Sequence, residues 1–261
     1  MLSYQHGYHA GGPADLHKHI ALAELLARLT AKPRGIGCFE THAGRGLYDL
    51  AAPEALKTGE AAQGIARIAP DPATPFGRAL GAVRAEHGPS AYPGSPLVAR
   101  ALLRPQDRLT LFELHPAEHA ALAATLGGAP GTAVHRRDGF AGVLARVPPA
   151  TRRGLVLVDP SYEVKDEYAA AAAFVRELAA KWPEATVLVW YPLLPAARHR
   201  ELLAGLAPLR PAVDEVRFAP PPARGMTGSG LTLIGAPYGA AAAAFAAARR
   251  QAAPVLAPAR P

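Results

Sequence analysis

The chain has 261 residues, of which half are hydrophobic and 19% are charged, which is ordinary for a globular protein with a sizeable core. Its single cysteine, Cys38, excludes an intrachain disulfide, and a structural zinc site is not expected without a Cys-x-x-Cys pair. We see no signal-peptide pattern and no run of 18 apolar residues, so we expect a cytoplasmic protein without a membrane span. The net charge of +7 favours a polyanionic partner such as nucleic acid, although a solvated basic surface explains the charge equally well.

The first part of the chain predicts one helix, one strand and one loop. Residues 14–31 are expected to be helical, because leucines recur there at three- and four-residue steps: Leu22, Leu25, Leu26 and Leu29. A short strand follows at 35–40, and "THAGRG" (41–46) reads as a glycine loop.

Residues 52–91 change the pattern. They contain two modest helical runs separated by the proline-rich stretch "APDPATP". We interpret 52–91 as an inserted helical subdomain. Residues 1–51 then hold an N-terminal motif, the first helix and the first strand, and residues 92–238 hold the remainder of the main domain.

From residue 92 onward, strands alternate with helices. Strands are expected at 108–114, 132–138, 154–160, 185–194, 212–220 and 230–238, and helices at 95–103, 116–128, 166–182 and 196–207. Residues 239–261 form an Ala-rich C-terminal tail, with a helix over 239–251 and a loose end after it. The alternation predicts an α/β fold with a parallel sheet covered on both faces.

In such a sheet, ligands bind beyond the carboxyl ends of the strands, so the residues that follow each strand are the candidates for a site. They include an acid at each of four strand ends: Glu40 with His42, Gly44 and Gly46; Glu113; Asp138 with Gly139; and Asp159 with Pro160 and Tyr162. Glycine lets the backbone turn tightly and approach a ligand. An acid at the end of the second strand is suited to two ribose hydroxyls, and one after the third strand is suited to an adenine edge. Together they indicate a nucleoside-type ligand.

The stretch "LVLVDPSYE" (155–163) indicates what the site does. An exocyclic amine on a base is a poor nucleophile, because its lone pair is conjugated into the ring. The Asp159 carboxylate and the carbonyl of Pro160, whose ring fixes the backbone and removes a donor, are suited to orient such an amine. Tyr162 is suited to stack on a base that has swung out of its helix.

"DPSY" resembles the [DN]PP[YF] motif of amino-group methyltransferases that use S-adenosyl-L-methionine. Further segments run in order along nearly the whole chain: "MLSYQHGYHAGGPADLHKH", "ETHAGRGLYDL", "YPGSPLVAR", "ELHP", "RRDGF", "RRGLVLVDPSYE" and "RGMTGSGLTLIGAPY". They closely resemble the RlmJ family of 23S ribosomal RNA adenine-N6-methyltransferases, which modify adenine 2030. Only the Ala-rich tail lies outside the resemblance.

The resemblance implies a Rossmann-like methyltransferase domain with a mainly parallel seven-stranded sheet and a small helical insertion. It also implies a site for S-adenosyl-L-methionine, with S-adenosyl-L-homocysteine as product, made of Lys18, His19, His42, Gly44, Ser95, Glu113, Asp138, Gly139 and Asp159. Asp159, Pro160 and Tyr162 would be the catalytic group. Tyr4, His6 and Lys18 would lie near the target adenine of 23S ribosomal RNA. Ser95 also reads as the N-cap of the helix at 95–103.

Three departures and several alternatives accompany this interpretation. Ser161 replaces the second proline of the motif, "HAGGPAD" has Gly-Pro where the family has Asn-His, and "GAPY" replaces "NPPW". We expect no metal, since His17 and His19 point to different sides of a helix, and no obligate protein partner. The same cofactor chemistry would also serve a DNA adenine or a protein glutamine amide. A non-catalytic RNA-binding assembly factor is the remaining alternative.

Overall fold

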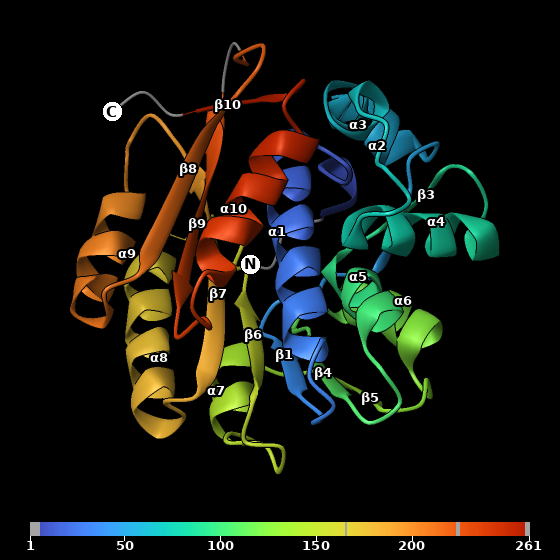
Figure 1. Ribbon diagram of the computed structural model, residues 1–261. Coiled ribbons are helices and arrows are strands. Elements are labelled where there is room, and N and C mark those ends of the chain that lie inside the picture. Colours follow the sequence, from blue (N-terminus) through green and yellow to red (C-terminus); the bar gives the residue numbers. More distant parts are fainter. Residues whose placement is uncertain (1–5, 165, 223–224, 259–261) are drawn as a thin grey trace.

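An eight-stranded sheet runs through the centre of the computed structural model, which describes residues 6–164, 166–222 and 225–258 (Figure 1). The strand order is β10-β8-β9-β7-β6-β1-β4-β5. The strands are β1 (Gly37–Glu40), β4 (Arg108–Phe112), β5 (Thr132–His135), β6 (Gly154–Val158), β7 (Ala185–Leu193), β8 (Ala212–Phe218), β9 (Gly228–Ile234) and β10 (Leu256–Pro258). β2 (Leu47–Asp49) and β3 (Ala91–Pro93) form a separate antiparallel pair.

The predicted parallel core is confirmed. β1 pairs in parallel with both β4 and β6, β4 with β5, and β6 with β7. β9 lies antiparallel between β7 and β8. Every residue of β1, β6 and β7 is buried, because helices cover both faces of these strands, which explains the apolar runs within β6 and β7.

The helices lie on both sides of the sheet. They are α1 (Pro13–Thr30), α2 (Pro53–Thr58), α3 (Glu60–Gln63), α4 (Pro75–His87), α5 (Ser95–Leu102), α6 (Pro116–Leu126), α7 (Gly139–Leu144), α8 (Glu167–Lys181), α9 (His199–Leu206) and α10 (Ala240–Gln251), with 3₁₀ turns η1 (His6–Tyr8), η2 (Ile65–Arg67) and η3 (Ala207–Leu209). α1 and α10 run side by side across the sheet, and α1 also contacts α4 and α5 (Figure 1). This encirclement buries α1 along almost its whole length.

The chain reverses its direction of travel across the sheet at β1. From β1 it proceeds through α5 to β4 and through α6 to β5, and it then returns to β6 on the other side of β1 and continues through α8 to β7. Right-handed crossovers therefore place α5 and α8 on opposite faces. The connections that leave the carboxyl ends of β1 and β6 run to opposite faces of the sheet at this switch point, which is where open α/β sheets form a crevice for ligands.

Between β2 and β3 the chain forms α2, α3, η2 and α4, where two helical runs were predicted. The first run is divided because Gly59 adopts a left-handed conformation (φ +66°) that ends α2, and Gly64 ends α3. The second run is α4, whose N-cap Thr74 accepts a hydrogen bond from the backbone N–H of Gly77.

Two predictions about the sheet and its end are wrong. The sheet has eight strands, not seven, among the residues that the structure describes, because β10 adds an antiparallel strand to the edge at β8. The segment after α10, which was predicted to be loose, is therefore packed against the protein as far as residue 258. Val255 is fully buried and Leu256 is 6% exposed, so these two apolar side chains hold the segment against the core.

Val255 should therefore contribute to stability. We expect Val255→Ala to lower the free energy of unfolding by about 1–3 kcal/mol, because it removes two methyl groups from a fully packed position. Val213→Ala on β8 is the matched control: Val213 is 45% exposed, and its loss should change stability by about 0.5 kcal/mol or less. Urea unfolding of both variants measures the difference, and equal midpoints would show that the segment is loosely attached.

Candidate functional site

A cavity of about 660 Å³ opens at the carboxyl ends of β1, β4 and β6. Its lining includes every described residue that the family resemblance assigned to the site: His6, Lys18, His19, His42, Gly44, Ser95, Glu113, Asp138, Gly139, Asp159, Pro160 and Tyr162. The sequence places these residues up to 156 positions apart, so only the tertiary fold brings them together. Glu40 and Gly46, which were also strand-end candidates, do not belong to the lining. Tyr4 lies outside the described residues.

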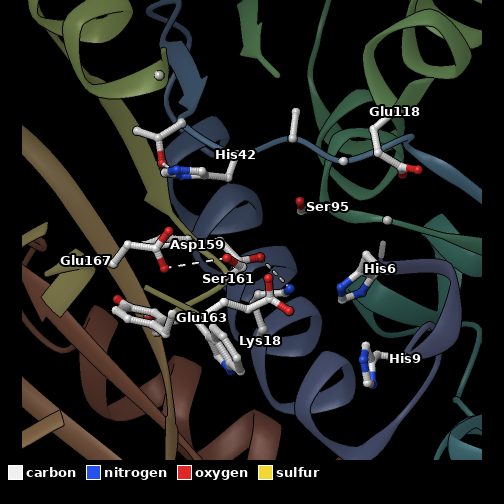
Figure 2. A pocket seen from close by; sticks show the side chains of 18 of the residues that line it. His6, His9, Lys18, His42, Ser95, Glu118, Asp159, Ser161, Glu163 and Glu167 are labelled. Atoms are coloured by element: carbon white, nitrogen blue, oxygen red, sulfur yellow. Dashed lines mark hydrogen bonds and ion pairs between the residues drawn. The ribbon is translucent and has the colours of Figure 1, made fainter. Parts of the chain in front are cut away.

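Lys18 and Asp159 point toward each other in the middle of the cavity (Figure 2). The Lys18 ammonium donates to Asp159 Oδ2 over 2.6 Å and lies 3.3 Å from Asp15 Oδ1. Burial disfavours the charged ammonium, but the two carboxylates outweigh burial and raise the pKa of Lys18. Lys18 is therefore a fixed positive charge that ties α1 to the residue that follows β6.

Asp15 sits one turn before Lys18 on α1 and organises the other side of this group. His6 Nε2 lies 3.0 Å from both Asp15 carboxylate oxygens, and the N–H of Gly11 donates to Oδ2 over 3.0 Å. Burial works to raise the pKa of Asp15, but His6, Lys18 and His19 outweigh it, so the pKa lies well below its usual value. Asp15 is thus a buried carboxylate that fixes the N-terminal turn against the cavity.

His19 and His42 are buried imidazoles. His19 Nδ1 lies 3.0 Å from the Tyr92 hydroxyl, and His42 Nδ1 lies 2.8 Å from Thr41 Oγ1. Burial lowers the pKa of His19 to about 3 and that of His42 to about 4, despite nearby acids. Both rings are neutral near pH 7 and can donate or accept one hydrogen bond at each nitrogen, according to tautomer.

Hydrogen bonds connect the glycine loop to the carboxylate of Glu113. The N–H of Gly44 donates to Glu113 Oε2 over 2.8 Å, and the N–H of His115 donates to Oε1 over 2.7 Å. Gly44 has φ +61°, and a Cβ atom there would lie 2.6 Å from the Tyr48 hydroxyl, so the turn requires glycine. Burial raises the pKa of Glu113, and the two N–H groups only partly offset this effect. The carboxylate retains lone pairs that can accept further hydrogen bonds from a ligand.

Asp138 and Gly139 begin α7 at the cavity. Asp138 is the N-cap, and its Oδ1 accepts from the N–H of Ala141 over 2.8 Å. At Gly139, an added Cβ would lie 1.8 Å from the carbonyl oxygen of Thr41, so only glycine allows α7 to approach the end of β1. Capping occupies one carboxylate oxygen of Asp138, which is compatible with a ligand at the other.

Ser95 has a different local role from the one predicted. Gly94 is the N-cap of α5, and Ser95 is the first helical residue. Its hydroxyl instead donates to Glu40 Oε2 over 2.6 Å at the end of β1. The other Glu40 oxygen is buried and has no hydrogen-bond partner among the described residues. Glu40 thus sits directly behind the cavity wall and holds Ser95 in place.

The segment that follows β6 has a strained backbone. Tyr162 adopts φ +56°, which is rare for a bulky residue and concentrates at functional sites. Its hydroxyl donates to the carbonyl of Trp190 over 2.8 Å, and its ring stacks on Tyr168 with the centroids 4.4 Å apart. Ser161 Oγ lies 3.5 Å from Glu167 Oε2, a contact that Figure 2 marks with a dashed line between these two side chains. One face of the Tyr162 ring is therefore already covered by protein.

Comparison with known proteins identifies the family. The family model described as "Ribosomal RNA large subunit methyltransferase D, RlmJ" matches residues 34–254. The chain belongs to this family. The predicted family is thereby confirmed, and membership makes the protein a methyltransferase enzyme of large-subunit ribosomal RNA.

Individual relatives agree. "Ribosomal RNA large subunit methyltransferase J" of Haemophilus influenzae is 37% identical over 256 residues, and the protein of the same name from Escherichia coli is 35% identical over 247. Each match covers 91% of this chain and 88% of the relative. A crystal structure of a Legionella pneumophila protein is 32% identical, covers 95% of this chain and 96% of that one, and superposes with a TM-score of 0.83. These similarities support the same fold along nearly the whole chain.

Several cavity residues were not predicted to line the site. Asp15 was not among the predicted site residues, although its spacing of three and four residues from Lys18 and His19 places all three on one helix face. Glu118 receives two hydrogen bonds from Arg45, over 3.0 and 2.7 Å. Trp190 lies within β7, and Met226 lies before β9, and neither follows a parallel strand. No strand-end pattern would have found these last two.

Among the described residues, no group of three or more His, Cys, Asp or Glu side chains is placed to hold a metal ion. Within the same part of the chain, no helix combines the length and apolar character required to cross a bilayer.

The buried Glu40 carboxyl predicts a pH dependence of stability. Burial raises its pKa from 4.5 to about 8, and the Ser95 hydroxyl only partly offsets this. Between these values the folded protein holds a proton that the unfolded chain has released. Stability should therefore fall as pH rises from 4.5 to 8, by up to about 1.4 kcal/mol per pH unit from this group.

Glu40→Gln cannot ionise and should remove this part of the slope, which urea unfolding at pH 5, 6, 7 and 8 measures. Glu177→Gln, on the exposed side of α8, is the control and should retain the wild-type slope. Parallel curves for the wild type and Glu40→Gln would show that Glu40 is ionised in the folded protein.

Proposed function

We propose that the protein transfers a methyl group from S-adenosyl-L-methionine to the N6 amine of an adenine in 23S ribosomal RNA, adenine 2030 by family resemblance. The observation that carries the proposal is the placement of Asp159 and Pro160 in one cavity with Glu113, Asp138 and His42. An amine-orienting pair and a nucleoside-type site thus share one enclosed space. The net charge of +7 supports a polyanionic substrate.

The residues present fit the cofactor. Glu113 offers a carboxylate for ribose hydroxyls, and Asp138 with Gly139 offers a carboxylate and a closely approached backbone for an adenine edge. Lys18, His19, His42, Gly44 and Ser95 complete the proposed set. When bound, S-adenosyl-L-methionine supplies a methyl group on a sulfonium centre, and S-adenosyl-L-homocysteine is the neutral leaving group.

Asp159 and Pro160 would orient the substrate amine. Lys18 holds Asp159 Oδ2 over 2.6 Å, so the position of the carboxylate is set before the substrate arrives, and Oδ1 is the oxygen that would accept from N6. The Pro160 carbonyl would accept the second N–H. Positioning of this kind accounts for most of the rate when the leaving group is already good. The proton of N6 leaves after the methyl group has been transferred.

The RNA would enter from the side of the N-terminal turn, where Tyr4, His6 and Lys18 are proposed to lie near the target adenine. The Tyr162 ring, held by Tyr168 on one face, would present its other face to the flipped base. DNA adenine and a protein glutamine amide would suit the same carbonyl and carboxylate. Methyl transfer to 23S ribosomal RNA fragments, duplex DNA and a glutamine peptide, assayed side by side, separates these substrates.

Glu113 should be required for cofactor affinity. We expect Glu113→Ala to weaken binding of S-adenosyl-L-homocysteine by about 1–3 kcal/mol, since a charged acceptor and the anchor of the Gly44 turn are both lost. Isothermal titration measures this affinity. Glu177→Ala, an exposed glutamate on α8, should bind like the wild type. Undiminished affinity in Glu113→Ala would remove Glu113 from the ribose role.

Asp159 should be required for chemistry and not for folding. We expect Asp159→Ala to remain folded, because Asp15 stays 3.3 Å from the Lys18 ammonium, but to lose about 10²–10³ in the rate of methyl transfer. Asp159→Asn keeps an acceptor oxygen and should retain partial activity. Single-turnover assays measure the rates, and circular dichroism checks the fold. Near wild-type transfer by Asp159→Ala would overturn the proposed role.

A further inference from the structure

A chain of hydrogen-bonded side chains, buried except for Arg249 at its outer end, runs behind the cavity and ends at the lining residue Trp190. His17 of α1 places Nδ1 2.9 Å from Ser229 Oγ of β9 and Nε2 3.1 Å from Asp214 Oδ2 of β8. Arg249 of α10 donates to Asp214 Oδ1. At the other end, the indole N–H of Trp190 donates to Ser229 Oγ over 2.9 Å. The chain therefore links four elements to one cavity residue.

The order Ser-His-Asp is that of a hydrolytic triad, but it does not serve as one here. His17 and Ser229 are fully buried, and Asp214 is 3% exposed. Neither His17 nor Ser229 belongs to the cavity lining, so no substrate carbonyl can reach Ser229 Oγ.

The donors and acceptors admit one consistent direction. The Asp214 carboxylate can only accept, so the Nε2–H of His17 donates to it, and Asp214 accepts from Arg249 at its other oxygen. In a neutral ring, Nδ1 is then an acceptor, so the Ser229 hydroxyl donates to Nδ1 and accepts from the Trp190 indole N–H. Burial lowers the pKa of His17, and Asp214 only partly offsets this, so the neutral ring is the form that the chain requires.

Trp190 connects this chain of hydrogen bonds to the cavity. It lines the cavity, and its ring centroid lies 5.5 Å from the Lys18 ammonium and 6.0 Å from the Tyr162 ring. Its backbone carbonyl accepts from the Tyr162 hydroxyl. Lys18 in turn holds Asp159. The orientation of the Trp190 indole therefore affects the positions of Lys18 and Tyr162, which flank the proposed catalytic carboxylate of Asp159.

We propose that His17 is a positioning residue. Through Ser229 it fixes the Trp190 indole, which keeps Lys18 and Tyr162 in position relative to Asp159 during methyl transfer. The proposal rests on the proposed function for its kinetic consequence. It assigns no contact with cofactor or RNA to His17, which is separated from the cavity by Ser229 and Trp190.

Paired substitutions test the direction of the hydrogen bonds. His17→Asn keeps a hydrogen-bond acceptor near the position of Nδ1, where Ser229 donates. His17→Gln keeps a donor near the position of Nε2 for Asp214 but loses the acceptor for Ser229. We expect His17→Gln and Ser229→Ala to lower the single-turnover rate by about tenfold or more. Their affinity for S-adenosyl-L-homocysteine should stay near the wild-type value. His17→Asn should restore most of the rate.

Thr232→Val is the matched control for Ser229→Ala. Thr232 is fully buried on the same strand, and its hydroxyl has no hydrogen-bond partner among the described residues. The substitution removes a buried hydroxyl without touching the chain, so the rate should not change. A purely structural role for Ser229 and His17 would make rate losses follow losses in melting temperature across all four variants.

A spectroscopic readout is independent of activity. The protein has two tryptophans, so Trp182→Phe leaves Trp190 as the sole indole fluorophore. In that background, Ser229→Ala and His17→Gln should shift the Trp190 emission and increase its quenching by acrylamide, while His17→Asn and Thr232→Val should not. Unchanged fluorescence in Ser229→Ala, or changed fluorescence with an unchanged transfer rate, overturns the proposal.

The two readouts separate this inference from the proposed function. If the wild type transfers no methyl group to ribosomal RNA, the proposed function fails. The fluorescence of the variants still reports whether His17 and Ser229 fix Trp190. If His17→Gln fails to fold, Ser229→Ala alone decides, because it replaces a small side chain with a smaller one at a fully buried position.

Discussion

The buried ammonium of Lys18 is the interaction on which the site depends. Lys18 is 4% exposed and Asp15 is 2% exposed, and a charge at such depth is tolerated only when it is paired. Asp15 and Lys18 belong to α1, whereas Asp159 follows β6, so the pairing locks the first helix onto the end of the central strand. His6 and the backbone of Gly11 close the other side of Asp15. The pairing thus acts together with contacts from the helical segment, such as His9 with Glu60 and the Ile65 N–H with the Gly11 carbonyl, to hold the N-terminal turn at the cavity.

Burial also determines which of the neighbouring titratable groups carry a charge. Burial keeps the His19 and His42 rings neutral, with pKa values of about 3 and 4, and raises the pKa of Glu40 to about 8. Lys18 is therefore surrounded by carboxylates and neutral rings. An acidic interior suits a cationic sulfonium ligand, whereas the overall charge of +7 suits an RNA backbone. The cavity is thus acidic while the protein as a whole is basic, which suits a cationic ligand inside and an anionic RNA outside.

The replacement of the second motif proline by Ser161 is accommodated by the fold around it. The backbone reversal at Tyr162, φ +56°, is held by the Tyr162–Trp190 hydrogen bond and by stacking on Tyr168. Ser161 contributes a contact with Glu167 at the start of α8. Since these contacts, not a proline ring, define the loop after Pro160, the geometry of the proposed amine-orienting pair does not require a proline at 161.

Local patterns were sufficient for much of this protein. The continuous apolar runs of β6 and β7 predicted a buried parallel sheet, and the strand-end residues Glu113, Asp138 and Asp159 predicted the edge of the sheet at which the cavity lies, because both signals depend only on neighbours in sequence. The tertiary structure decided the rest. β10 pairs with β8 across more than 35 residues of chain, and Ser95 bonds Glu40 instead of capping its own helix. The chain from Arg249 to Trp190 joins side chains up to 232 positions apart, and only packing of α1 against α10 and β9 determines that they meet.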